Sequence, residues 1–215
     1  MIIERNKILY IFDVDGTLTE PRKKMSPSFA NEFKEWSREK QLFIATGSDF
    51  TKTKQQVPPQ IIKCFKLVFC CMGNEIRNNN ESVIEKSTFS ITENLELDLA
   101  DILKNSKYPV KTGNHIEFRT GMVNFSTVGR NANPQQRIDY NLWDENNHER
   151  KAIIDFINKK YPTLNASIGG SISIDINEEG KDKGQIINYL ENKGAQKIIF
   201  VGDRCFPGGN DYGII

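Results

Sequence analysis

Hydrophobic residues gather in short runs that alternate with amphipathic segments toward both ends of the chain. The runs "KILYIF", "QLFIATGSD" and "FKLVFCCMG" indicate fully buried strands, and "QKIIFVGD" is of the same type. The segment "SPSFANEFKEWSREK" predicts a helix, with Ser26 as its N-cap and Pro27 at its first position. "FTKTKQQV" predicts a second helix that ends at Pro58. This alternation of strands and helices predicts an α/β fold with a Rossmann-like, doubly wound parallel sheet.

The pattern changes in the middle of the chain. "HIEFRTGMVNFSTVG" alternates apolar and polar positions on either side of Thr120-Gly121, which predicts an antiparallel hairpin. "NPQQRIDYNLWDENNHERKAIIDFINKKY" predicts one helix capped by Asn133, and "ASIGGSISIDINEEG" alternates again. We therefore predict a core formed by residues 1–82 and 183–215, with an inserted α+β cap domain at residues 83–182.

The composition narrows the class of protein. With 38% apolar and 10% aromatic residues, the 215-residue chain can form a substantial core. The formal net charge of +1 provides no global field that would attract nucleic acid or a membrane surface. No apolar run reaches the roughly 18 residues of a membrane span, and "MIIERNKILY" lacks the layout of a signal peptide. The four cysteines show no metal-type pairing and are typical of reduced thiols, so we expect a cytoplasmic protein.

Polar motifs follow the predicted strands at their carboxyl ends, where open parallel sheets bind ligands. "DVDGT", "TGSD" and "VGDRCFPGGND" occupy three such ends. Asp13, Asp15 and Asp203 would meet there, and three close carboxylates repel one another unless a cation neutralises them. A hard, oxygen-liganded ion such as Mg²⁺ suits this arrangement. An Asp-rich turn would also explain "DVDGT" alone, but it would not explain the ordered set of motifs.

These carboxylates point to phosphoryl transfer. With the metal in place, Asp13 can attack phosphorus and form an aspartyl-phosphate, while Asp15 handles the proton. Ser48 and Lys183 would bind the transferring phosphoryl oxygens. Lys183 in "DKGQII" also fits an ordinary lysine at the start of a helix.

The motifs together resemble those of the haloacid dehalogenase superfamily, and nearly the whole chain resembles eukaryotic-type phosphomannomutases. The resemblance is carried by "FDVDGTLTEPR", "TGSDF", "IEFRTGMVN", "VGR", "QQRI", "SIGGSISIDI", "DK" and "GDRCFPGGND", of which the cap strings are the most specific. It implies that Asp13 is the nucleophile and a metal ligand. It also implies that Asp15 is the general acid/base, with its backbone carbonyl on the metal, and that Asp203 is a metal ligand. The resemblance further implies a set of substrate-binding residues, the last of which lies with Asp211 in the "GGND" loop beside the metal: Arg22, Arg119, Arg130, Arg137, Ser173, Asp175 and Asn210.

The arginines separate a mutase from a phosphatase. A mutase must hold a second phosphate away from the metal, because its bisphosphate intermediate turns over. Guanidinium groups suit such a site, since each forms bidentate bonds and stays charged. Arginines scattered over an amphipathic cap fit a solvated surface equally well. The resemblance implies interconversion of mannose 6-phosphate and mannose 1-phosphate, Mg²⁺ as cofactor, hexose 1,6-bisphosphate as activator and a homodimer formed through the cap.

Two alternatives stay open at this point. A sugar-phosphate or sugar-bisphosphate phosphatase would use the same core. The chain ends at "NDYGII", where members of the resembled family continue, so a shortened, weakly active binding protein is the other alternative. The retained catalytic carboxylates argue against it. The turn "CCMGNEI" also departs from the acidic-Asn-Gly pattern of the family, and the sequence does not distinguish mannose from glucose phosphates.

Overall fold

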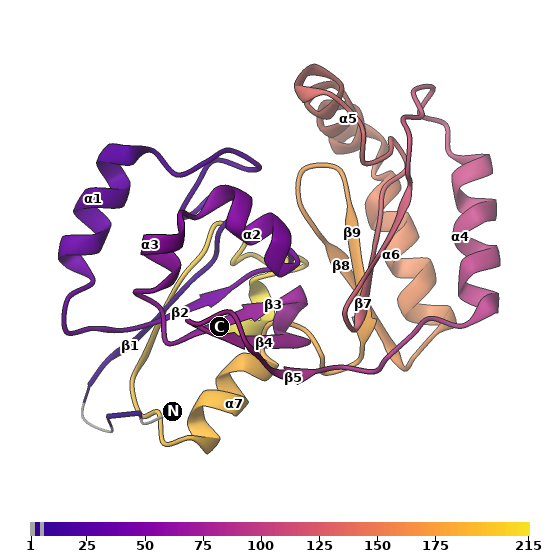
Figure 1. Cartoon of the computed structure of the whole chain (residues 1–215). Coiled ribbons are helices and arrows are strands. Elements are labelled where there is room, and N and C mark those ends of the chain that lie inside the picture. The colour runs from indigo at the N-terminus through magenta and orange to yellow at the C-terminus, as the bar shows by residue number, and fades with distance from the viewer. Residues whose placement is uncertain (1–2, 5–6) are drawn as a thin grey trace. The chain divides into compact units, whose positions relative to one another are not determined.

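The chain divides into two compact units in the computed structural model, which describes residues 3–4 and 7–215. The core contains the described residues up to Ser87 together with Gly180–Ile215, and the cap contains Thr88–Glu179. Each unit is built around its own sheet (Figure 1). The fold class is therefore the predicted one, an α/β core interrupted by an α+β unit.

The core sheet has the strand order β10-β1-β2-β3-β4-β5. Strands β10, β1, β2 and β3 run parallel, while β4 and β5 continue the sheet as an antiparallel hairpin. The carboxyl ends of the parallel strands therefore meet at one edge of the sheet. The strands are β1 (Leu9–Phe12), β2 (Gln41–Ala45), β3 (Leu67–Cys70), β4 (Glu75–Asn78), β5 (Val83–Lys86) and β10 (Ile198–Val201).

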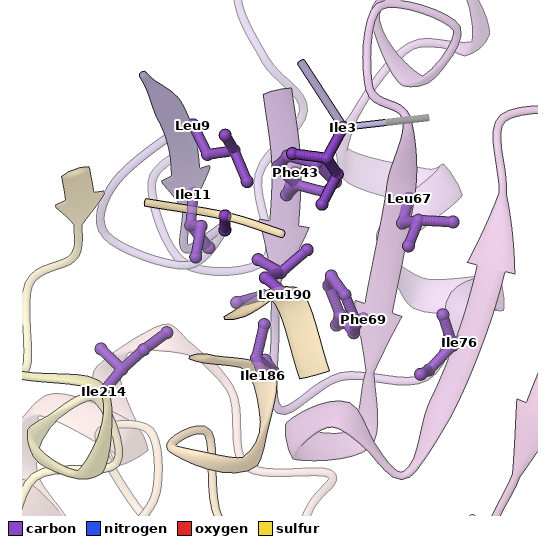
Figure 2. Close-up of a cluster of buried hydrophobic side chains, with 12 residues drawn as sticks. Ile3, Leu9, Ile11, Phe43, Leu67, Phe69, Ile76, Ile186, Leu190 and Ile214 are labelled. Carbon is purple, nitrogen blue, oxygen red and sulfur yellow. The ribbon is translucent and has the colours of Figure 1, made fainter. Parts of the chain in front are cut away.

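Helices cover both faces of the core sheet. Ile186 and Leu190 belong to a helix that packs against side chains of β1, β2 and β3, and Figure 2 shows this buried cluster. On the other face, Phe33 of the first helix contacts Phe12 of β1, with ring centroids 5.4 Å apart. The helices of the core are α1 (Pro27–Trp36), α2 (Phe50–Gln56), α3 (Pro59–Ile62) and α7 (Gln185–Asn192), with 3-10 turns at Cys71–Gly73 and Tyr212–Ile214.

The cap contains an antiparallel sheet with the strand order β6-β7-β9-β8. The hairpin predicted around Thr120-Gly121 is confirmed, because β6 and β7 pair on either side of it. Helices α4 and α6 cover one face of the sheet, where Leu99 and Ile157 pack into a cluster with strand residues (Figure 1). The elements of the cap are α4 (Glu93–Asn105), β6 (Ile116–Arg119), β7 (Met122–Phe125), α5 (Pro134–Asn147), α6 (Glu149–Lys160), β8 (Leu164–Ile168) and β9 (Ile174–Glu178).

Two local predictions are wrong. The single helix predicted after Asn133 is two helices, because His148 adopts the left-handed conformation with φ 53° and separates α5 from α6. The last strand, β10, is not fully buried. It lies at one edge of the sheet, and the side chains of Ile199 and Val201 are 43% and 39% exposed.

All four cysteines are free, and Cys70 and Cys71 are buried in the core. Within the described ranges, no helix combines the length and the apolar character needed to cross a membrane.

Candidate active site

Asp13 lies directly after β1, between the ends of β10 and β2. Its backbone N–H donates to the carbonyl of Val201 at 2.9 Å, so the end of β10 fixes its position. The Asp13 side chain is buried and accepts a hydrogen bond from Lys183, which is itself completely buried. Lys183 also donates to the carboxylate of Asp211. The end of the central strand thus holds a buried cluster of one ammonium and two carboxylates.

A third carboxylate joins this cluster from the loop after β10. Oxygens of Asp13, Asp203 and Asp211 all lie within 4.8 Å of one another. Two glycines allow this approach: a Cβ at Gly16 would lie 2.5 Å from Asp203 Oδ2, and one at Gly202 would lie 2.6 Å from Asp211 Oδ2. A side chain at either position would displace a carboxylate, so the glycines are part of the construction of the site.

The environment shifts the pKa values of this cluster. Burial raises the pKa of Asp13 to about 7, with the pull of Lys183 opposing that rise and the negative charge of Asp211 adding to it. Burial also raises the pKa of Asp203. Burial alone would lower the pKa of Lys183, but the charges of Asp13 and Asp211 outweigh it and raise that pKa. The lysine therefore stays charged, and the site favours loss of negative charge from its carboxylates.

The charge count shows that the site fits a divalent cation. Three ionised carboxylates against one ammonium leave two negative charges, and two of the carboxylates, those of Asp13 and Asp211, are buried. Arg204 is the next cation, with its Nε 3.8 Å from Asp203 Oδ2 and its side chain partly exposed. Carboxylate oxygens are the ligands that Mg²⁺ prefers. A magnesium ion would balance the buried charge, and the residues present fit it.

The side chain of Asp15 is held by hydrogen bonds from Gln56 and from the backbone of Arg22. Asp15 Oδ1 accepts hydrogen bonds from Gln56 Nε2 at 2.7 Å and from the backbone N–H of Arg22 at 2.9 Å. Gln56 also donates to Thr19 Oγ1 at 3.0 Å. The metal contact predicted for Asp15, through its backbone carbonyl, stays a prediction. Sequence reasoning did not identify Gln56, because a glutamine near the end of an amphipathic helix carries no motif.

Ser48 lies in the loop after β2 and is held by backbone hydrogen bonds. Its N–H donates to Thr46 Oγ1 at 3.0 Å, and its carbonyl accepts from the N–H of Cys71 at 3.0 Å. The N–H of Met72 donates to the carbonyl of Thr46 at 2.9 Å. Cys71 and Met72 have φ values of 50° and 64°, which are uncommon for residues other than glycine. The turn that departs from the family pattern therefore supports the loop predicted to bind phosphate.

In the cap, two of the predicted arginines meet at one carboxylate. Arg119 Nε donates to Glu117 Oε1 at 2.6 Å, and Arg130 Nε lies 3.4 Å from Glu117 Oε2. Arg119 Nη1 also lies 3.9 Å from Asp175 Oδ1. Both arginine side chains are largely buried, which argues against a solvated surface. Glu117 was not identified from the sequence, where it is one polar position of an alternating strand.

The third arginine fastens the loop before α5. Arg137 Nε donates to the carbonyl of Ala132 at 2.8 Å, and Arg137 Nη2 donates to the carbonyl of Arg130 at 3.0 Å. Ser173 is buried just before β9, where its carbonyl accepts from the N–H of Gly169 at 2.9 Å.

The predicted site residues fall into two groups. Those of the core are Asp13, Asp15, Arg22, Ser48, Lys183, Asp203 and Asn210, and those of the cap are Arg119, Arg130, Arg137, Ser173 and Asp175.

Comparison with known proteins gives a consistent result. A sequence profile of the family described as eukaryotic phosphomannomutase matches residues 29–215. The phosphomannomutase of Spinacia oleracea is 33% identical over 223 residues, covering 96% of this chain and 86% of the relative. That of Schizosaccharomyces pombe is also 33% identical and covers 97% of this chain and 85% of the relative.

A solved structure shows the fold independently. A haloacid dehalogenase-like hydrolase from Bacteroides thetaiotaomicron superposes with a TM-score of 0.60 at 15% sequence identity. The match covers 98% of this chain and 85% of that chain.

Proposed function

Because the chain belongs to the eukaryotic phosphomannomutase family, and is an enzyme of this kind, we propose that it interconverts mannose 6-phosphate and mannose 1-phosphate. The reaction passes through an aspartyl-phosphate on Asp13 and a hexose bisphosphate intermediate. The observation that carries the proposal is the buried cluster in which Asp13, Asp211 and Lys183 meet the carboxylate of Asp203.

Asp13, Asp203 and Asp211, with the backbone carbonyl of Asp15, would hold the magnesium ion. When bound, Mg²⁺ neutralises charge on the oxygens of the phosphoryl group. Lys183 contacts Asp13 directly and so lies where it can bind the same oxygens. Ser48 binds them from the loop after β2.

The two half-reactions use the same pair of carboxylates. Asp13 attacks a phosphorus of the hexose bisphosphate, the bond from phosphorus to the sugar oxygen breaks, and Asp15 gives that oxygen a proton. In the second half, the hydroxyl at the other end of a hexose monophosphate attacks the aspartyl-phosphate. Asp15 removes the hydroxyl proton, and Asp13 leaves as a free carboxylate. The hydrogen bond from Gln56 holds Asp15 between these steps.

The cap residues bind the parts of the substrate that do not react. Arg119, Arg130 and Arg137 hold the second phosphate, while Ser173 and Asp175 contact the sugar. In the core, Arg22 and Asn210 contribute to substrate binding. Hexose 1,6-bisphosphate activates the enzyme by phosphorylating Asp13.

The proposal includes a homodimer formed through the cap. It is supported by the exposed apolar side chains of three cap residues, Phe118, Ile138 and Leu142. Light scattering that gives a monomer mass at micromolar concentration would contradict the dimer.

The test incubates the protein with mannose 1-phosphate, Mg²⁺ and a hexose bisphosphate, and measures hexose 6-phosphate and free phosphate separately. A mutase forms hexose 6-phosphate, and the Asp13→Asn variant should form none. Free phosphate as the main product would favour the phosphatase instead.

A pair of variants tests the second phosphate site. Arg130→Ala should weaken hexose-phosphate turnover by one to two decades, because a hydrogen bond to a charged group is worth about 1.5–3 kcal/mol. Hydrolysis of acetyl phosphate, which has a single phosphate, should change little. The control is Lys151→Ala, which removes an exposed cap cation paired with Asp155. If both activities of Arg130→Ala fell together, the arginine would have a structural role.

A further inference from the structure

One face of the cap sheet carries polar side chains that are buried. Val123 and Phe125 of β7 and Ile174 and Ile176 of β9 belong to the hydrophobic cluster beneath α4 and α6. Because successive side chains of a strand point to opposite faces, Asn124, Asp175 and Asn177 share the other face. These three side chains are only 2%, 2% and 0% exposed. The buried side chain of Met122 shares this face, which otherwise presents polar side chains from which water is largely removed.

The orientation of the Asn124 amide is fixed by its neighbour. Asn124 Nδ2 donates to Asp175 Oδ1 at 2.6 Å. A carboxylate oxygen can only accept, so the reversed amide would bring two acceptors together. The amide oxygen must therefore point away from Asp175. Among the described residues it has no hydrogen-bond partner.

Two more buried oxygen atoms on this face lack a hydrogen-bond partner within the described part of the chain. Asn177 Oδ1 is buried without a partner, although its Nδ2 donates to the carbonyl of Glu178 at 2.9 Å. Ser167 Oγ, on β8, also has none. Ser167 and Asn124 lie opposite Asp175 on the two neighbouring strands, about 4.8 Å away on either side. One small ligand can span this distance, and the partly exposed Ser167 marks where the face reaches the surface.

We infer that Asn124 and Asn177 accept hydrogen bonds from hydroxyl groups of the sugar, beside Asp175, and so determine which hydroxyls the enzyme requires. This inference rests on the proposed function, because it takes hexose phosphates as the ligands. Buried polar atoms in folded proteins nearly always have hydrogen-bond partners, so these amide oxygens need a donor beyond the described residues, and a bound ligand would supply one.

The chemistry of the face selects the kind of ligand. The two amide oxygens and the carboxylate of Asp175 are all acceptors, so they require a ligand rich in neutral donors. A sugar carries several hydroxyl donors at close spacing. A phosphate group offers acceptors at neutral pH and would leave the amide oxygens unsatisfied. The phosphate is instead suited to Arg119, which lies on β6 with its Nη1 3.9 Å from Asp175.

The experiment is a double-mutant cycle, in which a protein side chain and a ligand hydroxyl are removed separately and together. Binding is measured by calorimetry in an Asp13→Asn background, which prevents turnover. The ligands are mannose 1-phosphate and its 2-, 3- and 4-deoxy analogues. Each ligand is measured with the Asp13→Asn protein, called the parent here, and with the parent that also carries Asn124→Leu or Asn177→Leu. In the parent, loss of a recognised hydroxyl should weaken binding about 5- to 20-fold. In the matching variant, the same deletion should change affinity by less than about twofold, because its partner is already gone.

The control is Asn158→Leu. Asn158 lies on α6, and both ends of its amide are bonded to the backbone of Ala166, at 3.1 Å and 2.7 Å. This variant should lower the thermal stability of the cap, yet every hydroxyl deletion should cost it as much as it costs the parent. The control separates a general loss of cap stability from the loss of one hydroxyl contact.

Several results would overturn the inference. If each deletion cost the variants as much as the parent, ordered water would be the partner of the amide oxygens. If no single hydroxyl mattered in the parent, or the parent bound no hexose phosphate at millimolar concentration, the inference would also fail. The parent series remains informative even if Asn124→Leu does not fold. Turnover by the wild type is measured separately. An inactive wild type would overturn the proposed function, while coupling in the cycle would still support a sugar-hydroxyl site.

Discussion

Replacing Lys183 with methionine should destabilise the core strongly. The lysine is completely buried and donates to Asp13 and Asp211, and methionine keeps most of its aliphatic length while removing the charge. Removal of one partner from a buried ion pair costs about 3–5 kcal/mol, because the remaining charge is left uncompensated. Here two buried carboxylates lose their shared cation. We expect a loss of unfolding free energy in this range at pH 8 in the presence of EDTA.

The loss should depend on pH in a defined direction. Burial raises the pKa of Asp13 to about 7 from its ordinary 3.8, and Lys183 opposes that rise, so the variant has a still higher pKa at Asp13. Between pH 3.8 and about 7, native Asp13 keeps a proton that it has released in the unfolded state. Stability contributed by this group therefore falls as pH rises through the window. The difference between wild type and variant should be smallest near pH 5, where Asp13 is protonated in both, and largest above pH 7.

Urea unfolding followed by circular dichroism, at several pH values between 5 and 8, measures this difference. The control is Lys160→Met, because Lys160 pairs with Asp98 at the surface, with its side chain 48% exposed, and such pairs contribute little to stability. Added Mg²⁺ should stabilise the wild type more at pH 8 than at pH 6, since a proton on Asp13 competes with the cation, and it should restore part of the loss in Lys183→Met. A loss in Lys183→Met below about 1 kcal/mol, or an equal loss at pH 5 and pH 8, would refute the reasoning.

Three further outcomes follow from the site. Gly16→Ala should cost roughly 1–3 kcal/mol more unfolding free energy than Gly180→Ala. Both glycines have positive φ, but only at Gly16 would the Cβ meet another side chain, so equal losses in urea would contradict the packing argument. Gln56→Leu should lower kcat about tenfold by releasing the carboxylate of Asp15, and steady-state kinetics that change only KM would exclude this role. Glu117→Gln should raise KM for mannose 1-phosphate without affecting acetyl phosphate hydrolysis, because it loosens the two arginines that the carboxylate holds. A lower KM would mean that Glu117 competes with phosphate.

The fold was predictable because its signals are local. Apolar runs that end in Asp13 and Asp203 predict strands whose carboxyl ends carry the candidate site, and the parallel order then brings those ends together. The alternation on either side of Thr120-Gly121 likewise predicts the hairpin from adjacent residues. Prediction failed where one backbone conformation decided the outcome, as at His148, whose left-handed φ divides a continuous helical pattern into two helices.

The ionic part of the site could be predicted further than its hydrogen bonds. Carboxylates that must be neutralised point to a cation from sequence alone, and in the structure Asp211, which the resemblance set beside the metal, lies in one group with Asp13 and Asp203. Partners such as Gln56, which lies 41 residues from Asp15, and Glu117 between two arginines carry no motif. Their contacts depend on which elements the fold brings together, and that is not written in any short stretch of the chain.

Discrimination between hexoses should depend on residues that carry no sequence motif and whose contacts follow from the fold. Mannose and glucose phosphates carry the same charge, so groups that bind the phosphate, such as Arg119, should treat both alike, and contacts to individual hydroxyls must separate them. In the sequence, Asn124 and Asn177 are ordinary polar positions of alternating strands. They stand out only when each buried donor and acceptor is matched with a partner and the amide oxygens are left over. A site built to bond a hydroxyl rejects a ligand without it more strongly than an apolar pocket rejects a wrong shape, because the unpaired polar group stays buried. We therefore expect the choice of sugar to depend on the polar face of the cap sheet, and the chemistry common to all hexose phosphates to depend on the carboxylates of the core.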